Sequence, residues 1–396
     1  MAKYYFIGSG IASLAGAAFL IRDCGVDGKD IVVFEEQLDF GGALDAHGSA
    51  DAGYFMSGSR MFESKYTCTF DLLASIPSGT DSRISVTDET NRVRAENSWN
   101  DKARLVDRSG SITDFHHLGF SERDRSDLLT LLATPERMLD GKRITDCFDS
   151  AFFEINFWYE WCTLFAFQQW HSAIEFKRYL QRFIHRFSTI DTEAGVYRTH
   201  FNQYDSIAVP LVAWLQGHGI EIRFDTTVTD LGFTEAGTER ITVNLISYSA
   251  AGSEAALAIA EDDCVFVTNG SMTADKAFGT MSTAPVLDSS KRSGSWRLWE
   301  TLARGRTAFG NPAVFDAHVN ESVWESFTVT DSDALFIEKI QTFTDSEAGR
   351  GGLTTFKDSN WLLTLSIFHQ PFLQTSLRTH SCGGGTGCTT ISRETL

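Results

Sequence analysis

The stretch KYYFIGSGIASLAGAAFLIRDCGVDGKDIVVFEE, residues 3–36, determines the fold class of this chain. A short apolar run is followed by a glycine-rich turn, an alanine-rich helical segment and a run of β-branched residues, and this order is typical of a βαβ unit. The turn GSGIAS, residues 8–13, is a GxGxxG pattern in which serine replaces the third glycine. Gly8 suits the tight turn, and Gly10 lets backbone N–H groups at a helix N-terminus approach a pyrophosphate. The sequence therefore predicts a dinucleotide-binding unit.

The end of this unit supports a dinucleotide, and the glycine pair that follows it favours FAD over a nicotinamide dinucleotide. Glu35 ends the second predicted strand, where a carboxylate can accept hydrogen bonds from ribose hydroxyls. Gly41 and Gly42 follow, and such a pair lets the backbone pass close to the cofactor in FAD enzymes of the glutathione-reductase type; the alternative is a merely flexible loop. The candidate cofactor-binding residues are Gly8, Ser9, Gly10, Ala12, Ser13, Glu35, Glu36, Gly41, Gly42, Arg60, Asn269, Gly270 and Ser271.

The remaining pattern predicts a discontinuous domain organisation. Residues 202–217 are expected to form a helix despite Pro210, alternating strands follow, and residues 262–267 are expected to be a buried strand that ends in a turn at 268–271. The predicted fold class is α/β, with a Rossmann-like FAD-binding domain of glutathione-reductase type and an inserted helical, aromatic substrate domain. The FAD domain is expected to comprise residues 1–80, 200–275 and about 350–373. Residues 81–199 would form the helical insertion, and 276–349 a substrate-binding region.

Aromatic residues are concentrated in the predicted insertion, with nine between Phe152 and Trp170. Such density builds a large core, which is the default, or walls an apolar ligand tunnel. The helix expected at 175–187 has two faces. Its apolar face is formed by Phe176, Tyr179, Leu180, Phe183, Ile184 and Phe187, and its basic face by Arg178, Arg182 and Arg186, with Lys177 and His185 beside them. The basic face is expected to be solvated; the alternatives are that it receives a carboxylate or contacts an anionic membrane.

Composition limits the partners and the compartment. The 34 Lys and Arg against 52 Asp and Glu give a net charge of −18, which repels a phosphate backbone, so nucleic acid is not expected as a partner. The first apolar stretch lacks a charged n-region and is interrupted by glycine, and no later window approaches the length of a membrane span. Seven scattered cysteines form no disulfide framework, which favours a reducing cytoplasm.

Taken together, several segments resemble the oleate hydratases, FAD-dependent fatty-acid hydratases once called myosin-cross-reactive antigens. The matching segments run from residue 3 to about 371: GSGIASLAGAAFLIRD, FEEQLDFGGALD, DLLASIPS, ARLV, FAFQQWHSAIEFKRYLQRF, NQYDSI, VFVTNGSMT and GGLTTFKDSNWLL. The resemblance implies a cytoplasmic or membrane-peripheral enzyme, monomer or homodimer, that adds water to the cis-9 double bond of an unsaturated fatty acid such as oleate. It also implies FAD, preferably reduced, without net redox change, and a 10-hydroxy acid as product.

Hydration of an isolated alkene needs a proton donor at one carbon and an activated water at the other. In the family, a Glu in an RGGREM-like motif is assigned the water and a Tyr the proton. Met61 stands where this carboxylate is expected, and Glu63 is the nearest acid that could replace it, unless it is an exposed surface residue. Tyr179 is the expected proton donor, kept neutral by burial, or else a core residue; Tyr204 is the second choice.

Two other polar residues and the chain terminus are expected to have no catalytic role. His171 and Asp205 are expected to be structural, Asp205 as a hydrogen-bond acceptor. Residues 374–396 do not resemble the family and lack apolar periodicity, which predicts a disordered tail from an altered reading frame, a splice or a truncated gene. The two cysteines of CGGGTGC have no further ligands at metal spacing, so no metal is expected. A FAD oxidoreductase on an apolar substrate and a catalytically inactive flavoprotein remain alternatives to the hydratase.

Overall fold

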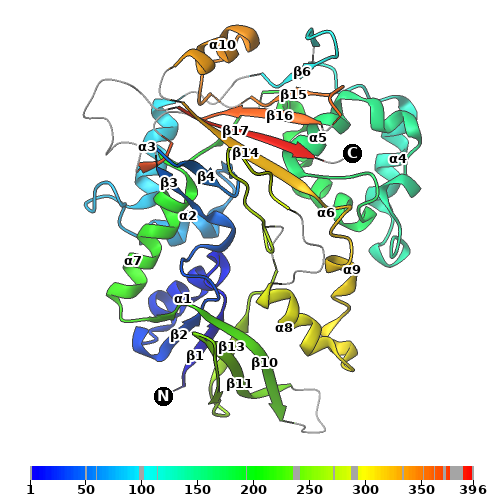
Figure 1. The fold of residues 1–396 in the computed structure, drawn as a ribbon. Helices are drawn as coiled ribbons and strands as arrows, with labels where there is room; N and C mark the ends of the chain where they lie inside the picture. Colours follow the sequence, from blue (N-terminus) through cyan, green and yellow to red (C-terminus); the bar gives the residue numbers. More distant parts are fainter. Residues whose placement is uncertain are drawn as a thin grey trace.

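The computed structural model describes residues 2–49, 51–58, 60–97, 102–113, 115–192, 194–234, 241–270, 273–286, 293–331, 334–350, 352–360, 362–368, 372–374 and 387–394. Their helices and strands form an α/β structure with three packed regions. Figure 1 shows the N-terminal parallel sheet at the bottom, a second sheet at the top and a helical region beside that second sheet.

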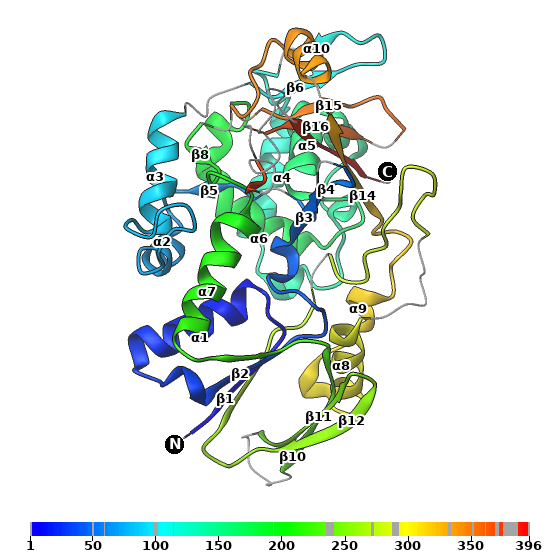
Figure 2. The same cartoon turned by 60° about the vertical axis from the view of Figure 1, so that its left-hand side comes forward.

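The N-terminal region is built on a parallel four-stranded sheet in the order β13-β1-β2-β9. Its strands are β1 (Tyr4–Ile7), β2 (Ile31–Phe34), β9 (Glu221–Arg223) and β13 (Cys264–Val267). Side chains alternate between the two faces of a strand. Phe6 and Val33 accordingly pack under α1 (Ile11–Cys24) and α7 (Val209–Gly217), which lie side by side in Figure 2. The sequence thus predicted this βαβ unit correctly.

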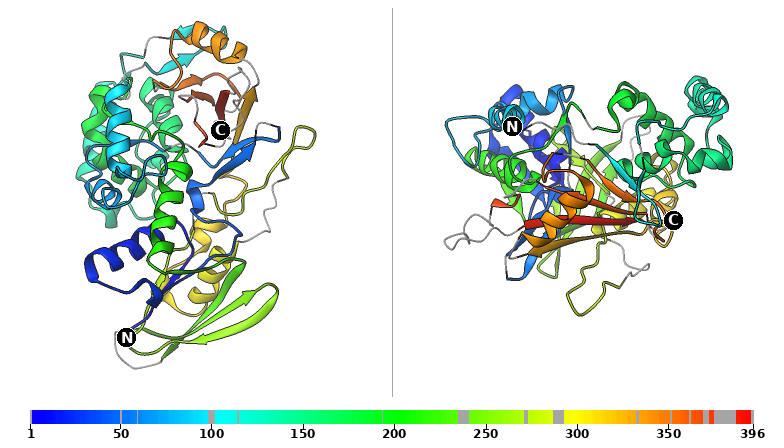
Figure 3. Two further views of the ribbon diagram at one scale, coloured as in Figure 1. Left: turned by 90° about the vertical axis from the view of Figure 1, so that its left-hand side faces the viewer. Right: turned by 90° about the horizontal axis from the view of Figure 1, so that it is seen from above.

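The opposite face of the parallel sheet is covered by an antiparallel meander and one helix. Tyr5, Ile7, Val32 and Phe34 point to this face and share a core with the meander and α8. These elements are β10 (Thr226–Thr234), β11 (Thr242–Ala250), β12 (Ser253–Ala258) and α8 (Gly294–Ala303). The left view of Figure 3 shows α1 and the meander on opposite sides of β1 and β2.

The second sheet has six strands in the order β14-β17-β16-β15-β6-β7. Their bounds are β6 (Arg104–Val106), β7 (Ile112–Thr113), β14 (Trp324–Asp331), β15 (Thr354–Phe356), β16 (Leu363–Ile367) and β17 (Gly387–Glu394). All neighbours are antiparallel except β15 and β6. Further helices and short strands are β3 (Ala46–Ser49), β4 (Gly53–Met56), β5 (Phe62–Glu63), β8 (Val196–Tyr197), α2 (Thr67–Leu73), α3 (Val86–Glu96), α9 (Ala313–Asp316) and α10 (Leu335–Thr344).

The helical region contains α4 (Glu122–Ala133), α5 (Asn156–Phe165) and α6 (Ala173–Phe183), which a 3₁₀ turn continues from Ile184 to Thr189. Most of the predicted aromatic cluster lies in its core: Phe152, Phe153, Phe157, Trp158, Trp161 and Phe167 are all buried. These rings pack edge-to-face or tilted against one another, as between Trp161 and Phe176 with 5.7 Å between ring centroids. The aromatic cluster is therefore a core, as the default expectation had it.

Three expectations about domain boundaries differ from the structure. Residues 104–113 and 354–367 belong to the six-stranded sheet, so the insertion is not purely helical and the segment near 350–373 adds no strand to the parallel sheet. Strand β13 is not buried, because β1 is its only neighbour among the described strands and Phe266 and Val267 are left 40% and 38% exposed. Strand β17 lies in the tail predicted to be disordered; backbone pairing with β14 and β16 orders it without the apolar periodicity on which that prediction relied.

Candidate functional site

The glycine-rich turn leaves β1 and ends at α1. Gly8 has φ +90°, and a Cβ on it would lie 3.2 Å from the carbonyl oxygen of Thr268, so the chain itself requires glycine there. Gly10 has an ordinary φ of −67°, and a Cβ on it would meet nothing within 4 Å. Among the described residues, therefore, no contact explains a glycine at position 10, and the space in front of it is open.

This open space lies at the N-terminus of α1. Gly10 is the N-cap residue and offers no side-chain oxygen, and the first turn of α1 contains no acidic residue. Exposed Ala12 lies in this first turn. Free N–H groups and the partial positive charge of a helix N-terminus are suited to an anion such as a pyrophosphate. The residues present thus fit the dinucleotide that the sequence predicts.

The second glycine pair lies directly on this turn. Gly41 pairs with Gly10 as an isolated parallel bridge, and the Gly41 N–H donates to the Ser9 carbonyl at 3.1 Å. Gly41 and Gly42 have φ values of +97° and +56°, and a Cβ on Gly42 would lie 3.2 Å from the Gly10 Cα. Close backbone packing, and not loop flexibility alone, therefore accounts for the pair.

Glu35 holds the turn from the end of β2. Its Oε2 accepts from the Ser9 N–H at 2.8 Å and from the Ser9 hydroxyl at 2.6 Å, and its Oε1 accepts from the Gln37 N–H at 2.9 Å. A carboxylate has about four acceptor positions, so one on Oε1 remains for a ribose hydroxyl. Buried Ser9 thus orients Glu35 and does not face a ligand.

Other predicted cofactor residues serve the packing around the turn. The Ser13 hydroxyl lies 2.9 Å from that of Thr268, which in turn donates to the Ile7 carbonyl, so serine at the third glycine position joins α1 to the end of β13. Sequence reasoning did not single out Thr268, although its place at a strand end beside Gly8 was a usable signal. Glu36 accepts from the Gly294 N–H at 3.0 Å and so caps α8; burial raises the pKa of its carboxyl group.

The expected turn after β13 is described in part. Gly270 has φ +75° and a Cβ on it would lie 3.2 Å from the Trp296 ring, while Asn269 is half-buried beside it. Ser271 lies outside the described residues. Asn269 and Gly270 therefore stand at the carboxyl end of the parallel sheet, where ligands bind in open α/β folds.

Arg60 and Tyr204 lie on the glycine-pair side of the cradle. The Gln203 amide donates to the Arg60 carbonyl at 2.7 Å, and an Arg60 guanidinium N–H donates to the Ala43 carbonyl at 3.4 Å. Burial lowers the pKa of Arg60. The Tyr204 hydroxyl donates to Asp39 at 2.6 Å; burial and this bond raise the Tyr204 pKa well above its usual range. Tyr204, in the π-helical turn Tyr204–Ala208, is thus committed to Asp39 and is a poor proton donor to substrate.

Glu63 is neither an exposed surface residue nor a free acid. Its side chain is 2% exposed, and two arginines and a histidine of the helix that begins with α6 surround it. Arg182 contacts Oε1 at 2.6 Å, whereas His185 at 3.0 Å and Arg186 at 2.9 Å contact Oε2. Burial alone would raise its pKa, but the hydrogen bonds from His185, Arg186 and Arg182 outweigh burial and lower it to about 2. A carboxylate held in this way is a weak base, which argues against the prediction that Glu63 replaces an acid at Met61.

The basic face is solvated at Arg178 and Arg182, as expected, yet its side chains also pair with other groups of the protein. Lys177 donates to the Thr134 carbonyl, and Arg178 forms a bidentate pair with Glu136 at 2.8 and 2.6 Å. Arg182, His185 and Arg186 all contact Glu63, two residues after half-buried Met61. The basic side chains therefore join the helix to α4 and to β5 and give no support to membrane binding.

Tyr179 lies on α6 at the edge of the aromatic core. It is 36% exposed, less buried than the sequence predicted, and its ring contacts Phe165 and Phe167 with centroids 5.3 and 5.1 Å apart. Burial, and then the charge of Glu175, raises the pKa of its phenol, so it remains protonated. Tyr66, under the Arg182 guanidinium, also acts on it electrostatically. Tyr179 is thus a neutral, accessible proton donor beside an apolar wall.

The two residues expected to be structural behave as such. His171 accepts from the Gln168 N–H at 3.2 Å, and burial lowers its pKa to about 4, so it is neutral. Asp205 accepts from the Asn202 amide at 2.6 Å and from the Gln374 N–H at 2.9 Å.

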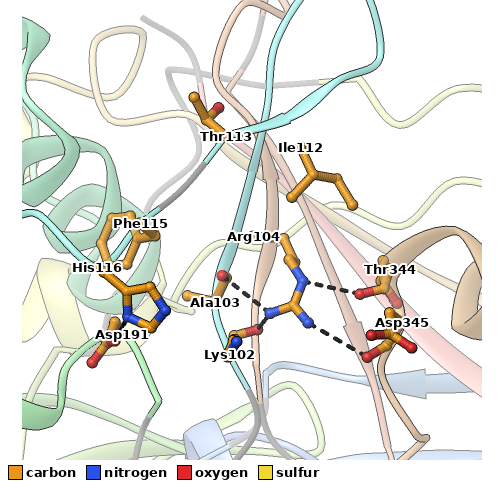
Figure 4. A pocket seen from close by; sticks show the side chains of 10 residues that line it. All are labelled: Lys102, Ala103, Arg104, Ile112, Thr113, Phe115, His116, Asp191, Thr344 and Asp345. Carbon is orange, nitrogen blue, oxygen red and sulfur yellow. Dashed lines mark hydrogen bonds and ion pairs between the residues drawn. The ribbon is translucent and has the colours of Figure 1, made fainter.

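A cavity of about 370 Å³ lies between β6, β7 and the C-terminus of α10, and none of the predicted site residues lines it (Figure 4). The Arg104 guanidinium there donates to the carbonyl oxygens of Thr344 at 2.9 Å, Lys102 at 2.6 Å and Asp345 at 3.4 Å. This cation therefore caps the end of α10 and is not free to bind a carboxylate.

A parallel βαβ unit with a glycine-rich turn at an uncapped helix N-terminus defines a Rossmann-like dinucleotide-binding protein. The chain belongs to the MCRA family, whose model matches residues 1–381. It is 34% identical over 374 residues to the oleate hydratase of Streptococcus pyogenes serotype M49 (strain NZ131), covering 93% of this chain and 63% of that protein. It is 31% identical over 405 residues to the linoleate hydratase of Lactiplantibacillus plantarum, covering 94% and 71%.

The chain thus spans less than two-thirds of the length of the streptococcal relative. Among solved structures, an oxidoreductase from Methanosarcina mazei is similar in fold, with a TM-score of 0.53 at 14% identity over 100% of this chain and 79% of that one. No helix in the described part of the chain is long and apolar enough to cross a bilayer.

Proposed function

We propose that this chain binds FAD at the cradle formed by Gly8, Gly10, Gly41 and Gly42 and hydrates the cis-9 double bond of an unsaturated fatty acid. Oleate would give 10-hydroxystearate. The hydratase names of the two relatives support the reaction class. The observation that carries the proposal is Tyr179, a protonated phenol at the rim of an aromatic core.

The cradle supports FAD through two features. The pyrophosphate would lie at the N-terminus of α1, in front of Gly10, and the remaining acceptor position of Glu35 would bind a ribose hydroxyl. Hydration consumes no electrons, so bound FAD, in the reduced form that the family resemblance implies, would supply local charge and shape and would not act as an oxidant.

Tyr179 would donate a proton to one alkene carbon, and water would add to the other. The rings of Phe165 and Phe167 would exclude bulk water from the fatty-acid chain once its double bond is protonated.

We propose that the protein is cytoplasmic or membrane-peripheral and that it is a monomer or a homodimer.

The test is incubation of the FAD-reconstituted protein with oleate in water enriched in ¹⁸O. Mass spectrometry should detect labelled 10-hydroxystearate, without consumption of oxygen or of an added electron acceptor. Oxygen consumption with unlabelled product would instead favour an oxidoreductase.

One observation favours a second candidate, a flavoprotein without turnover. Met61 offers no ionisable group, and Glu63 is held by Arg182, His185 and Arg186. Bound FAD with no labelled product would select this alternative.

A further inference from the structure

We propose that Glu175 and Tyr179, one turn apart on α6, form a general base and general acid pair, with Glu175 accepting the proton from the water that adds to the alkene. The inference rests on the proposed hydratase function and names the carboxylate that this function requires.

The spacing of the two residues on α6 places them on one face. Residues four apart in an α-helix lie one above the other, with their Cβ atoms about 5–6 Å apart. Tyr179 contacts Phe165 and Phe167, and its hydroxyl has no hydrogen-bond partner among the described residues. Its proton is therefore available to a ligand.

Glu175 differs from the other charged residues of this helix in having no partner. Lys177, Arg178, Arg182, His185 and Arg186 are all engaged by Thr134, Glu136 or Glu63. In the described part of the chain, no hydrogen bond or ion pair reaches the Glu175 carboxylate. Glu175 is thus an unpaired carboxylate one turn from a phenol. The basic side chains of its helix are all engaged by other groups, so the carboxylate is free to act in catalysis.

The electrostatics agree with these roles. The Glu175 residue is exposed, yet the protein around its carboxyl group raises its pKa by desolvation, which makes the carboxylate a better base. Its negative charge in turn contributes to the raised pKa of Tyr179. The two groups are thus close enough for the charge of Glu175 to act on the phenol of Tyr179.

The proposed cycle balances without a further reactant. The O–H bond of Tyr179 breaks as a C–H bond forms at one alkene carbon, while the water oxygen forms a C–O bond at the other carbon and gives its proton to Glu175. Glu175 then returns this proton to the Tyr179 phenolate across one helical turn. The net reaction adds one water to one double bond.

The kinetic test compares Glu175→Gln with the matched Glu136→Gln, which removes a carboxylate that pairs with α6 on its exposed side. Loss of a general base should lower kcat by roughly 10²–10⁴-fold, with KM for oleate nearly unchanged. Glu136→Gln should retain the kcat of the parent. A kcat of Glu175→Gln close to that of the parent would overturn the pair.

A second measurement does not depend on turnover. The parent and Tyr179→Phe are titrated with base while absorbance at 295 nm is followed, and the difference between the two curves gives the ionisation of Tyr179. The same difference is then measured between Glu175→Gln and the double variant that also carries Tyr179→Phe. Removal of the negative charge should lower the pKa of Tyr179, and an unchanged pKa would refute the coupling. A parent protein that binds FAD but produces no hydroxystearate would refute the proposed function, whereas the titration would still decide whether the two groups interact.

Discussion

Replacement of Glu63 by glutamine should destabilise the protein at neutral pH, because it removes the one carboxylate that pairs with Arg182, His185 and Arg186. Glutamine keeps the shape of the side chain but leaves two guanidinium groups and an imidazole clustered around a neutral amide. The variant therefore tests whether these contacts hold β5 to the helix that begins with α6.

The size of the effect follows from the pKa of Glu63. Its folded value of about 2 compares with 4.5 for the unperturbed group, and each unit corresponds to 1.36 kcal/mol, so the folded environment stabilises the carboxylate by about 3 kcal/mol. Arg182 is 41% exposed and Arg186 20% exposed, so solvent screens part of this energy. We expect the free energy of unfolding to fall by about 2–3 kcal/mol.

The effect has a defined dependence on pH. The folded pKa is depressed, so the contribution is complete above the unfolded value of 4.5 and is lost as pH falls toward 2. The difference in the free energy of unfolding between parent and variant should consequently be constant from about pH 6 to 7 and should shrink steadily below pH 5.

Urea denaturation monitored by tryptophan fluorescence at several pH values measures this difference. Glu136→Gln is the control, because it removes an exposed partner of Arg178 and should cost much less. Equal destabilisation by the two variants at pH 7 would refute the reasoning. So would a decrease in the free energy of unfolding of Glu63→Gln that is as large at pH 3 as at pH 7.

Three further predictions concern the cofactor, the chemistry and the C-terminal strand. Gly10→Val should abolish FAD retention by filling the open space in front of α1, whereas Gly217→Ala, at another uncrowded glycine with an ordinary φ, should retain the yellow colour; flavin absorbance after gel filtration compares them. Tyr179→Phe should bind oleate but lower hydration roughly 10²–10⁴-fold, as measured by mass spectrometry, while Tyr204→Phe should retain most activity. Removal of residues 387–396 should lower the melting temperature, since β17 pairs with β14 and β16, and an unchanged value would contradict this pairing.

Local patterns predicted the cofactor cradle because its determinants are close together in sequence. The apolar run, the glycines of residues 8–13 and the acid at Glu35 form one continuous βαβ unit, and the structure places them as expected. The aromatic core of the insertion was equally predictable, since its rings fall within a few helical turns.

The surroundings of the candidate catalytic residues were less predictable because they depend on contacts between distant segments. Glu63 and Arg186 are 123 residues apart, so nothing in the local sequence indicated that the expected solvated face of the helix would surround an acid. The exposure of β13 likewise depends on the absence of a second neighbouring strand in the described structure, whereas its apolar sequence alone resembles that of a central strand.

The parallel pairing of β6 with β15 has a consequence for the biosynthesis of this chain. Arg104 pairs with Thr354, so the ribosome adds about 250 residues after β6 before its partner strand exists. At about 5–20 residues per second, that interval lasts roughly 12–50 s. During this time the edge of the β6–β7 hairpin is open to strands of other nascent chains. The six-stranded sheet can therefore be completed only late in synthesis, whereas the strands and helix of the βαβ unit have all been made by residue 36.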